Sequence, residues 1–290
     1  MAGVLMDKTS VASTGNGVRH GSRSHPTLNP SLKGKRVLIT GGSSGIGKAT
    51  VFAFDANGCS VAVLGRTKER LDVVAKQLKV GVSIVADLTK EEDMKRAVKE
   101  ALEKLGGLDI LVNSGGVSSE EASGNDEAAF LASFRMHVTG NLTLIRAAQE
   151  ELIKNKGAIV NVTSTLALFP SEGFLTYGVA KAAQDKLTKD LAFEFATKGV
   201  RVNSILPAVI NTEAYDGVAK ANGVTRADIM AGMAPKHAMG RVAEPEEVAR
   251  PIVFLASNAA SFITGASLLV DGGMMLGNWF NKGNFSEASA

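Results

Sequence analysis

The sequence predicts an α/β fold, a single-domain Rossmann-like structure with a doubly wound parallel sheet of about seven strands and helices on both faces. The first observation is that short apolar runs, rich in β-branched residues, alternate with long segments of helical spacing from Arg36 onward. Continuous apolar strands separated by helices are typical of a parallel sheet that is covered on both sides. The second observation is the length of 290 residues with 45% hydrophobic residues, which suffices for one large core.

Seven segments have the composition of buried strands. They are residues 36–40, 60–65, 82–86, 108–113, 157–163, 200–206 and 267–270. Most of the segments between them have the apolar spacing of helices. Residues 211–240 interrupt this alternation before the last strand, and they predict a helical lid. We expect one domain over residues 33–275, because no repeat or second zone of composition divides it.

The two ends of the chain differ from this domain. Residues 1–32 are rich in Ser, Gly and polar groups without apolar periodicity, which predicts a disordered N-terminal tail. Residues 276–290 predict a short C-terminal tail. The first segment carries arginine and serine with almost no acid, a composition that also faintly resembles an organelle import peptide. We expect a cytoplasmic protein, with import through this tail as the alternative.

Charge and composition argue against several classes of function. Residues 1–36 hold six basic residues and one acidic residue, which leaves 26 basic and 28 acidic residues in the remaining chain. A nearly neutral body gives no support for nucleic-acid binding. Cys59 is the sole cysteine and the four histidines are scattered, so no metal site is expected. No apolar run approaches the roughly 18 residues of a membrane span, and no membrane partner is expected.

The first strand runs directly into the segment TGGSSGIGKAT. Gly41, Gly45 and Gly47 allow a tight turn, close approach of the backbone to a pyrophosphate, and close packing of helix on strand. The next helix would direct its free N–H groups at that phosphate. Because these glycines lie between a strand and a helix, they predict a dinucleotide site, with Ser43 and Ser44 as further donors.

The end of the second strand indicates which dinucleotide is bound. Gly65 stands where NAD-binding proteins usually place an acid, and Arg66 follows it. A guanidinium binds a 2′-phosphate that a carboxylate would repel, so NADP(H) is favoured over NAD(H). Alternatively, Arg66 lies in a solvated turn. Asp87, at the end of the third strand, is placed to accept from the adenine amine, or to cap a helix that begins near Thr89.

Several further motifs follow in a fixed order. NSGG occupies residues 113–116, and Ser164 precedes Tyr177 by 13 residues, in the segment TYGVAKAA that also holds Lys181. With the glycine loop and the late segments VRVNSILPAVINT and GRVAEPEEVARPIVFLASNAASFITGASLLVDGG, the chain resembles the short-chain dehydrogenase/reductase family over residues 33–273. A lone Tyr-x-x-x-Lys pair occurs by chance in many proteins, whereas this series at compatible spacings does not.

The resemblance implies a catalytic group of Ser164, Tyr177 and Lys181. Tyr177 and Lys181 are four positions apart, so they share one face of a helix. A fixed ammonium favours the phenolate and would lower the pKa of Tyr177 toward neutrality. Tyr177 would then exchange a proton with a carbonyl or alcohol oxygen that Ser164 holds. The alternative is an ordinary exposed helix pair.

From the loop, the strand ends and the resemblance we expect seventeen residues to contact the cofactor. They are Thr40, Gly41, Ser43, Ser44, Gly45, Ile46, Gly47, Arg66, Asp87, Leu88, Asn113, Gly115, Tyr177, Lys181, Pro207, Ile210 and Thr212.

Three departures from the family pattern stand out. His137 aligns with a fourth catalytic residue, an asparagine that holds a water in a proton relay. An imidazole can also donate and accept, so His137 either carries this relay or is a histidine satisfied by backbone groups. Asn141 lies one turn further and would need a helix shift to reach the same water. Ser114 and Gly115 replace Asn-Ala, and Ala208 replaces a glycine, which limits the backbone near the nicotinamide.

The expected function is an NADP(H)-dependent oxidoreductase acting on a ketone or a secondary alcohol. One alternative is a 3-oxoacyl- or enoyl-thioester reductase for carrier-protein or CoA substrates, which needs basic residues at the pocket mouth; Lys236, His237 and Arg241 are the nearby group. Another is an NADP-binding sensor or scaffold without turnover. A mostly apolar wall favours a hydrophobic substrate: Leu166, Leu168, Phe169, Phe174, Tyr215, Met230 and Met233.

The resemblance also bears on assembly. Residues 126–154 and 175–197 correspond to helices that the family packs between subunits, and the first segment is apolar over more than one face. We expect a homotetramer, with a dimer as the alternative.

Overall fold

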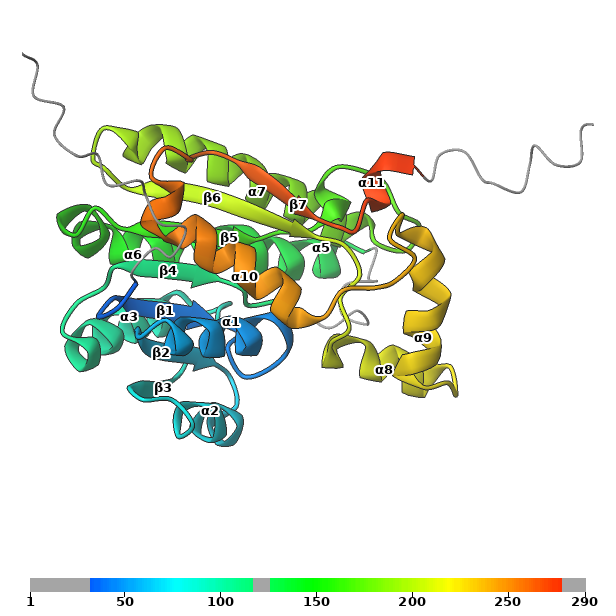
Figure 1. Ribbon diagram of the computed structural model, residues 1–290, viewed down its shortest axis with the longest axis horizontal. Helices are drawn as coiled ribbons and strands as arrows, with labels where there is room; N and C mark the ends of the chain where they lie inside the picture. The colour runs from blue at the N-terminus through cyan, green and yellow to red at the C-terminus, as the bar shows by residue number, and fades with distance from the viewer. Residues whose placement is uncertain (1–31, 117–125, 278–290) are drawn as a thin grey trace, which may run out of the picture.

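Seven parallel strands form one sheet in the spatial order β3-β2-β1-β4-β5-β6-β7 (Figure 1). The computed structural model describes residues 32–116 and 126–277. The sheet confirms the predicted fold class, and every strand lies within two residues of its predicted bounds. The strands are Arg36–Thr40 (β1), Ser60–Gly65 (β2), Gly81–Val85 (β3), Ile110–Asn113 (β4), Ala158–Val162 (β5), Arg201–Pro207 (β6) and Ser267–Val270 (β7).

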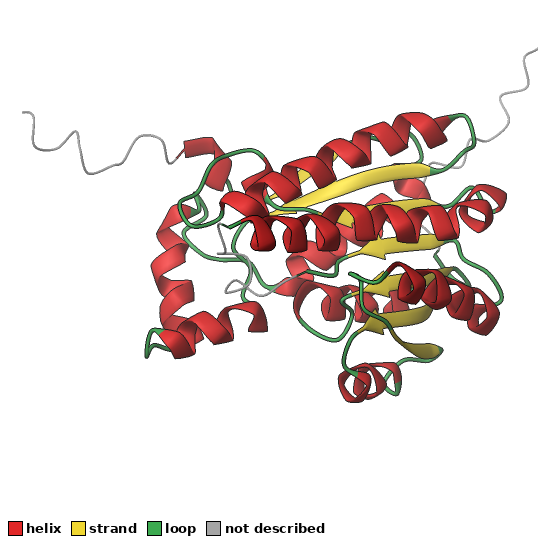
Figure 2. Cartoon of the chain, turned by 180° about the vertical axis from the view of Figure 1, so that it is seen from behind, coloured by secondary structure: helices red, strands yellow, loops and turns green. Residues whose placement is uncertain are grey.

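Helices cover both faces of the sheet, as the view from behind also shows (Figure 2). The α-helices are Gly45–Ala56 (α1), Lys68–Ala75 (α2), Glu91–Leu105 (α3), Glu127–Phe134 (α5), Gly140–Lys154 (α6), Leu175–Ala196 (α7), Asp216–Ala221 (α8), Arg226–Met233 (α9), Pro245–Ala256 (α10) and Met274–Gly277 (α11). Arg135–Thr139 (η1) is a turn of π-helix. Short 3₁₀ turns are Thr165–Ala167 (η2), Glu213–Tyr215 (η3), Ala234–Lys236 (η4) and Asn258–Ala260 (η5).

The core consists of two apolar layers that the sheet separates. Val37 and Ile39 of β1 pack in one layer with residues of α1, α2 and α10, and Leu38 packs in the other with residues of α3, α6 and α7. All three side chains are fully buried. Because both faces of the strand are covered, it reads as an uninterrupted apolar run rather than an alternating one.

Leu32, the last residue of the predicted N-terminal tail, is buried and packs in the core. Residues 276 and 277 of the predicted C-terminal tail belong to α11, and the rest of both predicted tails lies outside the described residues. The predicted lid over residues 211–240 consists of η3, α8, α9 and η4, and it stands beyond the carboxyl ends of the strands (Figure 1). Among the described residues, no helix combines the length and the apolar character of a membrane span.

The strand order reverses between β1 and β4, since β1 leads to β2 on one side while β4 leads to β5 on the other. Loops that leave adjacent strands in opposite directions open a crevice at the carboxyl edge of the sheet, where ligands of such folds bind. The glycine loop after β1 and the loop after β4 meet at this place.

Candidate active site

A cavity of about 860 Å³ lies between this edge of the sheet and the lid, a size suited to a cofactor and a small substrate. It brings together most of the predicted site residues. These are Gly41, Ser43, Ser44, Gly45, Ile46, Gly47, Arg66, Leu88, Gly115, Ser164, Tyr177, Lys181, Pro207, Ile210 and Thr212. Thr40, Asp87, Asn113 and His137 lie outside the lining.

The glycine loop has no room for side chains at its closest turns. A Cβ on Gly47 would lie 2.2 Å from the carbonyl oxygen of Gly41, and a Cβ on Gly41 would lie 2.8 Å from Cα of Gly115. Gly41 also has a φ of +68°, a left-handed conformation that favours glycine. The bare backbone at the start of α1 therefore allows a phosphate to approach closely, in a cradle that fits a diphosphate.

Thr40 and Asn113 support the loops from behind. The Thr40 hydroxyl accepts hydrogen bonds from the backbone N–H groups of Ser114 and Gly115 at 3.0 and 2.8 Å. The Asn113 amide donates to the Asn161 side chain at 2.8 Å. Both side chains are buried, so they join β1, β4 and β5 and position the loops that form the cavity.

One end of the cavity gathers positive charge and hydroxyl groups. Arg66 is exposed. It lines the cavity together with Ser43 and Gly65. Arg70, in the first turn of α2, lines it as well. We had not predicted Arg70, because Arg66 precedes the N-cap Thr67 of α2 and no helical spacing relates the two arginines.

Asp87 is engaged in its own turn. Its carboxylate accepts from the backbone N–H of Thr89 at 2.9 Å and from the Thr89 hydroxyl at 2.8 Å. These hydrogen bonds hold the pKa of Asp87 below its ordinary value, and the bond from the backbone N–H of Thr89 contributes most. The sequence offered capping of a helix near Thr89 as the alternative role of Asp87. Helix α3 begins only at Glu91, so the carboxylate closes the turn that precedes this helix. Contact with an adenine stays a prediction.

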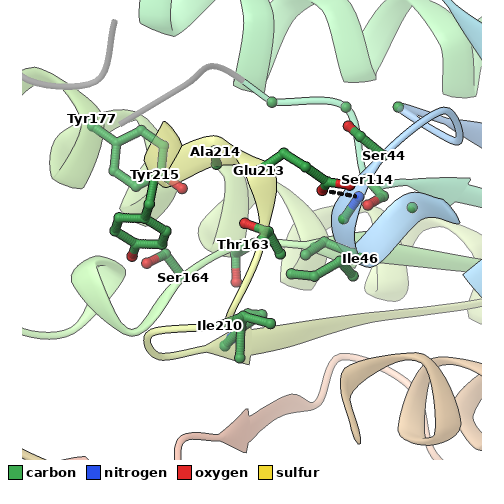
Figure 3. A pocket seen from close by; sticks show the side chains of 18 of the residues that line it. Ser44, Ile46, Ser114, Thr163, Ser164, Tyr177, Ile210, Glu213, Ala214 and Tyr215 are labelled. Carbon is green, nitrogen blue, oxygen red and sulfur yellow. Dashed lines mark hydrogen bonds between the residues drawn. The ribbon is translucent and has the colours of Figure 1, made fainter. Parts of the chain in front are cut away.

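Ser164, Tyr177 and Lys181 come together from two segments of the fold. Ser164 follows β5, and its hydroxyl accepts from the backbone N–H of Leu166 at 3.1 Å. Tyr177 and Lys181 lie in α7, with the lysine Nζ 5.4 Å from the centre of the phenol ring. Lys181 is only 3% exposed, which rules out an ordinary exposed helix pair. Figure 3 shows Ser164 and Tyr177 at one end of the pocket, together with Tyr215 of the lid.

The sequence predicted that Lys181 lowers the pKa of Tyr177, and for this structure that prediction is wrong. Burial raises the pKa of Tyr177 above its ordinary value, the Tyr215 phenol adds to the rise, and a hydrogen bond with Ser164 opposes it. Burial also lowers the pKa of Lys181 to about 7. Loss of hydration disfavours both charged forms. Tyr177 therefore keeps its proton at neutral pH, which suits a proton donor.

Gln184 holds Lys181 and was missed from the sequence. The lysine Nζ donates to the carbonyl oxygen of Val162 at 3.0 Å and to the side-chain oxygen of Gln184 at 3.1 Å. Both acceptors are neutral, so the buried ammonium of Lys181 is hydrogen-bonded by these two groups but is not neutralised by them. Gln184 lies three positions after Lys181 in α7, a spacing that could have indicated the contact.

His137 is fully buried in the π-turn η1. Its ring meets the Tyr177 ring edge-on, with the ring centres 5.3 Å apart. Neither ring nitrogen has a hydrogen-bond partner among the described residues, so the structure does not show the backbone-satisfied alternative. Burial and then the charge of Lys181 hold the pKa of His137 well below its ordinary value. The imidazole is therefore neutral at physiological pH.

Asn141 lies at the start of α6, directly after the π-turn η1. The Asn141 amide donates to the carbonyl oxygen of His137 at 2.9 Å, and its side-chain oxygen is buried without a partner among the described residues. Among the described residues, His137 and Asn141 thus both retain buried polar atoms without a hydrogen-bond partner, and His137 lies against Tyr177.

The loop after β6 accommodates its departure from the family pattern. Ala208 lines the cavity and its N–H donates to the carbonyl oxygen of Val270 at 3.2 Å. Among the described residues, Lys156 is the sole non-glycine residue with a positive φ, so Ala208 is not strained. Thr212 lies against the glycine loop, with its Cγ2 3.1 Å from the place that a Cβ on Gly45 would take.

The substrate wall is more polar than the sequence predicted. Leu166, Phe169, Phe174, Tyr215 and Met233 line the cavity as expected, whereas Leu168 is half exposed and Met230 is buried within the lid. The lining also includes polar side chains beyond the predicted set: Ser114, Thr163, Thr165, Ser171, Glu213, Asp216 and Lys236.

Comparisons with known proteins agree with this geometry. The family model described as Enoyl-(Acyl carrier protein) reductase matches residues 41–275. An L-fucose dehydrogenase of Mus musculus is 37% identical over 246 residues, which cover 84% of this chain and 89% of that protein. This chain belongs to the short-chain dehydrogenase/reductase family. As a member of the family, the protein is an oxidoreductase enzyme that uses a nicotinamide cofactor.

Two further relatives extend the comparison of this short-chain dehydrogenase/reductase. A glucose 1-dehydrogenase of Gluconobacter oxydans (strain 621H) is 35% identical over 254 residues, covering 84% of this chain and 92% of that protein. The crystal structure of L-sorbose reductase from Gluconobacter frateurii complexed with NADPH and L-sorbose matches with a TM-score of 0.80 and 30% identity. That match covers 86% of this chain and 100% of the other.

Proposed function

We propose that the protein is an NADP(H)-dependent oxidoreductase that interconverts a ketone and a secondary alcohol on a small polyhydroxylated molecule. The observation that carries this proposal is that Ser164, Tyr177 and Lys181 line the same cavity as the glycine loop. A proton donor and a dinucleotide cradle are thereby combined in one space that also has room for a substrate.

Two arginines support the preference for NADP(H). Arg66 and Arg70 both line the cavity beside Ser43, and no acidic residue ends β2. Guanidinium groups bind phosphate oxygens through charge-assisted hydrogen bonds. Among the described residues, Arg66 forms no ion pair, so it is available for a 2′-phosphate.

The residues suggest the following chemistry for reduction. When bound, the nicotinamide supplies the hydride that reaches the carbonyl carbon. Tyr177 donates its phenolic proton to the carbonyl oxygen, which the Ser164 hydroxyl orients by a hydrogen bond. The ammonium of Lys181 then stabilises the phenolate that Tyr177 becomes. Oxidation of an alcohol reverses these steps.

The polar part of the lining supports a hydroxylated substrate. Tyr215 and Thr165 carry hydroxyl groups into the cavity near Ser164, and hydroxyl groups of a substrate need such partners when they leave water. The named relatives are an L-fucose dehydrogenase, a glucose 1-dehydrogenase and an L-sorbose reductase. Their names point to sugars as the class of substrate to test first.

The thioester reductase alternative finds less support. Of its three basic residues only Lys236 lines the cavity. His237 is buried and its Nδ1 meets the carbonyl oxygen of Met233 at 3.1 Å, while Arg241 pairs with Glu247 at 2.7 Å. Two of the three basic residues on which this alternative depends are therefore engaged elsewhere and do not line the cavity.

The function is tested by assaying sugars, simple ketones and acyl thioesters in parallel with NADPH and NADH. We expect turnover of a hydroxylated substrate and a higher kcat/KM with NADPH. Preferred turnover of thioesters would replace the proposed substrate class, and a preference for NADH would overturn the role of Arg66. Binding of NADPH with no turnover of any compound would favour a sensor.

We also propose that the protein assembles as a homotetramer. Exposed apolar side chains lie on the helices expected at subunit contacts, including Phe130 and Leu131 of α5 and Phe193 of α7, which is 88% exposed. A second group lies near β7, where Phe262 is fully exposed. Patches of this kind mark interfaces in soluble proteins. Light scattering of the purified protein should give four times the chain mass; a monomer would contradict the proposal.

A further inference from the structure

The N-terminus of α1 is capped from a distant part of the chain. The backbone N–H of Gly45, the first residue of α1, donates to Oε2 of Glu213 at 3.0 Å (Figure 3). These residues are 168 positions apart. Glu213 is the first residue of η3 and thus belongs to the start of the lid.

Helix α1 has no such cap of its own. The Ser44 side chain at the N-cap makes no capping hydrogen bond, and the first turn contains no acidic residue. An uncapped helix start beside a glycine loop is the arrangement that attracts a phosphate. In this structure the Glu213 carboxylate, which belongs to the lid, accepts the hydrogen bond from the first N–H of α1.

The contact is specific in its geometry. The Thr212 side chain lies 3.1 Å from the place that a Cβ on Gly45 would take, so the chain before Glu213 rests directly on the loop. Among the described residues, no ion pair joins Glu213 to a basic side chain. Its carboxylate is directed to the phosphate loop and not to a cation.

A carboxylate and a diphosphate compete for the same place. Both are anions, both accept from the N–H groups at the helix start, and their mutual repulsion falls off only over several ångströms. We propose that Glu213 is a displaceable internal competitor of the cofactor's diphosphate, which lowers cofactor affinity and links the occupancy of the phosphate loop to the lid. This inference rests on the proposed dinucleotide function.

The link reaches the catalytic end through the same short turn. Tyr215 is the last residue of η3, two positions after Glu213, and it lies beside Ser164 and Tyr177 (Figure 3). A displacement of Glu213 by the diphosphate therefore acts on the segment that carries a side chain of the substrate pocket.

Calorimetric titration tests the proposal without requiring turnover. The variants are Glu213→Gln, which keeps an acceptor but removes the charge, and Glu213→Ala, which removes both. Glu213 is exposed, so neither change opens a cavity in the core. Glu246→Gln in the exposed first turn of α10 is the matched control for net charge. The ligands are NADPH, ADP and adenosine, of which only the first two carry a diphosphate.

We expect both Glu213 variants to bind NADPH and ADP about two- to fivefold more tightly, as an exposed charge at a helix N-terminus allows. Adenosine binding and the Glu246→Gln variant should match the unaltered protein. Equal or weaker binding of ADP by the Glu213 variants would overturn the proposal, because a merely structural contact would weaken the loop when lost. Failure of the unaltered protein to bind any of the nucleotides would instead overturn the dinucleotide function itself.

Discussion

The phosphate loop and the catalytic end of the same cavity are built in different ways. The loop is a run of consecutive residues whose backbone we propose to bind the diphosphate, so its residues need little more than the absence of side chains. The proposed catalytic end consists of side chains from the loop after β5, η1, α7 and the lid, and burial influences their protonation. The first region therefore depends on local shape, and the second on the environment that the whole fold creates.

The largest effect is expected at the catalytic end. Tyr177→Phe removes the proton donor, so kcat should fall about 100- to 10,000-fold. The dissociation constant of NADPH, measured by calorimetry, should change little, because the glycine loop is untouched. A variant that retains more than a tenth of the parent kcat would contradict the assignment of Tyr177.

The matching test of the loop is Gly47→Ala. Its Cβ would lie 2.2 Å from the Gly41 carbonyl oxygen, and such crowding costs about 1–3 kcal/mol. We expect weaker NADPH binding together with a lower melting temperature. Gly232→Ala in α9 is the control, since its Cβ meets nothing within 4 Å. If both variants bound NADPH like the parent, the loop would not depend on close backbone approach.

The protonation of Lys181 predicts that activity at the catalytic end of the cavity depends on pH. Burial lowers its pKa to about 7, so Lys181 is charged below this pH and neutral above it. Only the charged form stabilises the phenolate left on Tyr177 after proton donation. The kcat/KM for carbonyl reduction should therefore fall as the pH rises through about 7.

Gln184→Glu provides the matched variant for this profile. A carboxylate in place of the neutral acceptor raises the pKa of Lys181, so the decline should move to higher pH. Cofactor binding at a fixed pH serves as the control for folding. An unchanged profile would show that another group titrates.

The smallest effect is expected for His137→Asn. Because burial keeps the imidazole neutral, its removal should leave the inflection near pH 7 in place and lower only the plateau, by less than about tenfold. The comparison is made with rate–pH profiles of the two proteins. Superimposable profiles would dismiss a relay role, and His137 would then only pack against Tyr177.

The strands and the glycine loop were predictable from the amino-acid sequence alone, and so was the proposed catalytic group. Apolar runs such as residues 36–40 specify buried strands because both faces of a parallel sheet are covered. The spacing of Gly41, Gly45 and Gly47 between a strand and a helix predicts the loop, because turns this tight leave no room for side chains. Ser164, Tyr177 and Lys181 were predicted from a motif whose two helical members share one face.

How these groups behave depends on the folded chain as a whole. Lys181 is a neighbour of Tyr177 along the helix, but the direction of the Tyr177 pKa shift depends on burial, to which every packed element contributes. Likewise, residues 168 positions apart form the contact between Glu213 and Gly45. Periodicity and motifs report on neighbours along the chain, whereas desolvation and long-range hydrogen bonds arise when distant segments exclude water together.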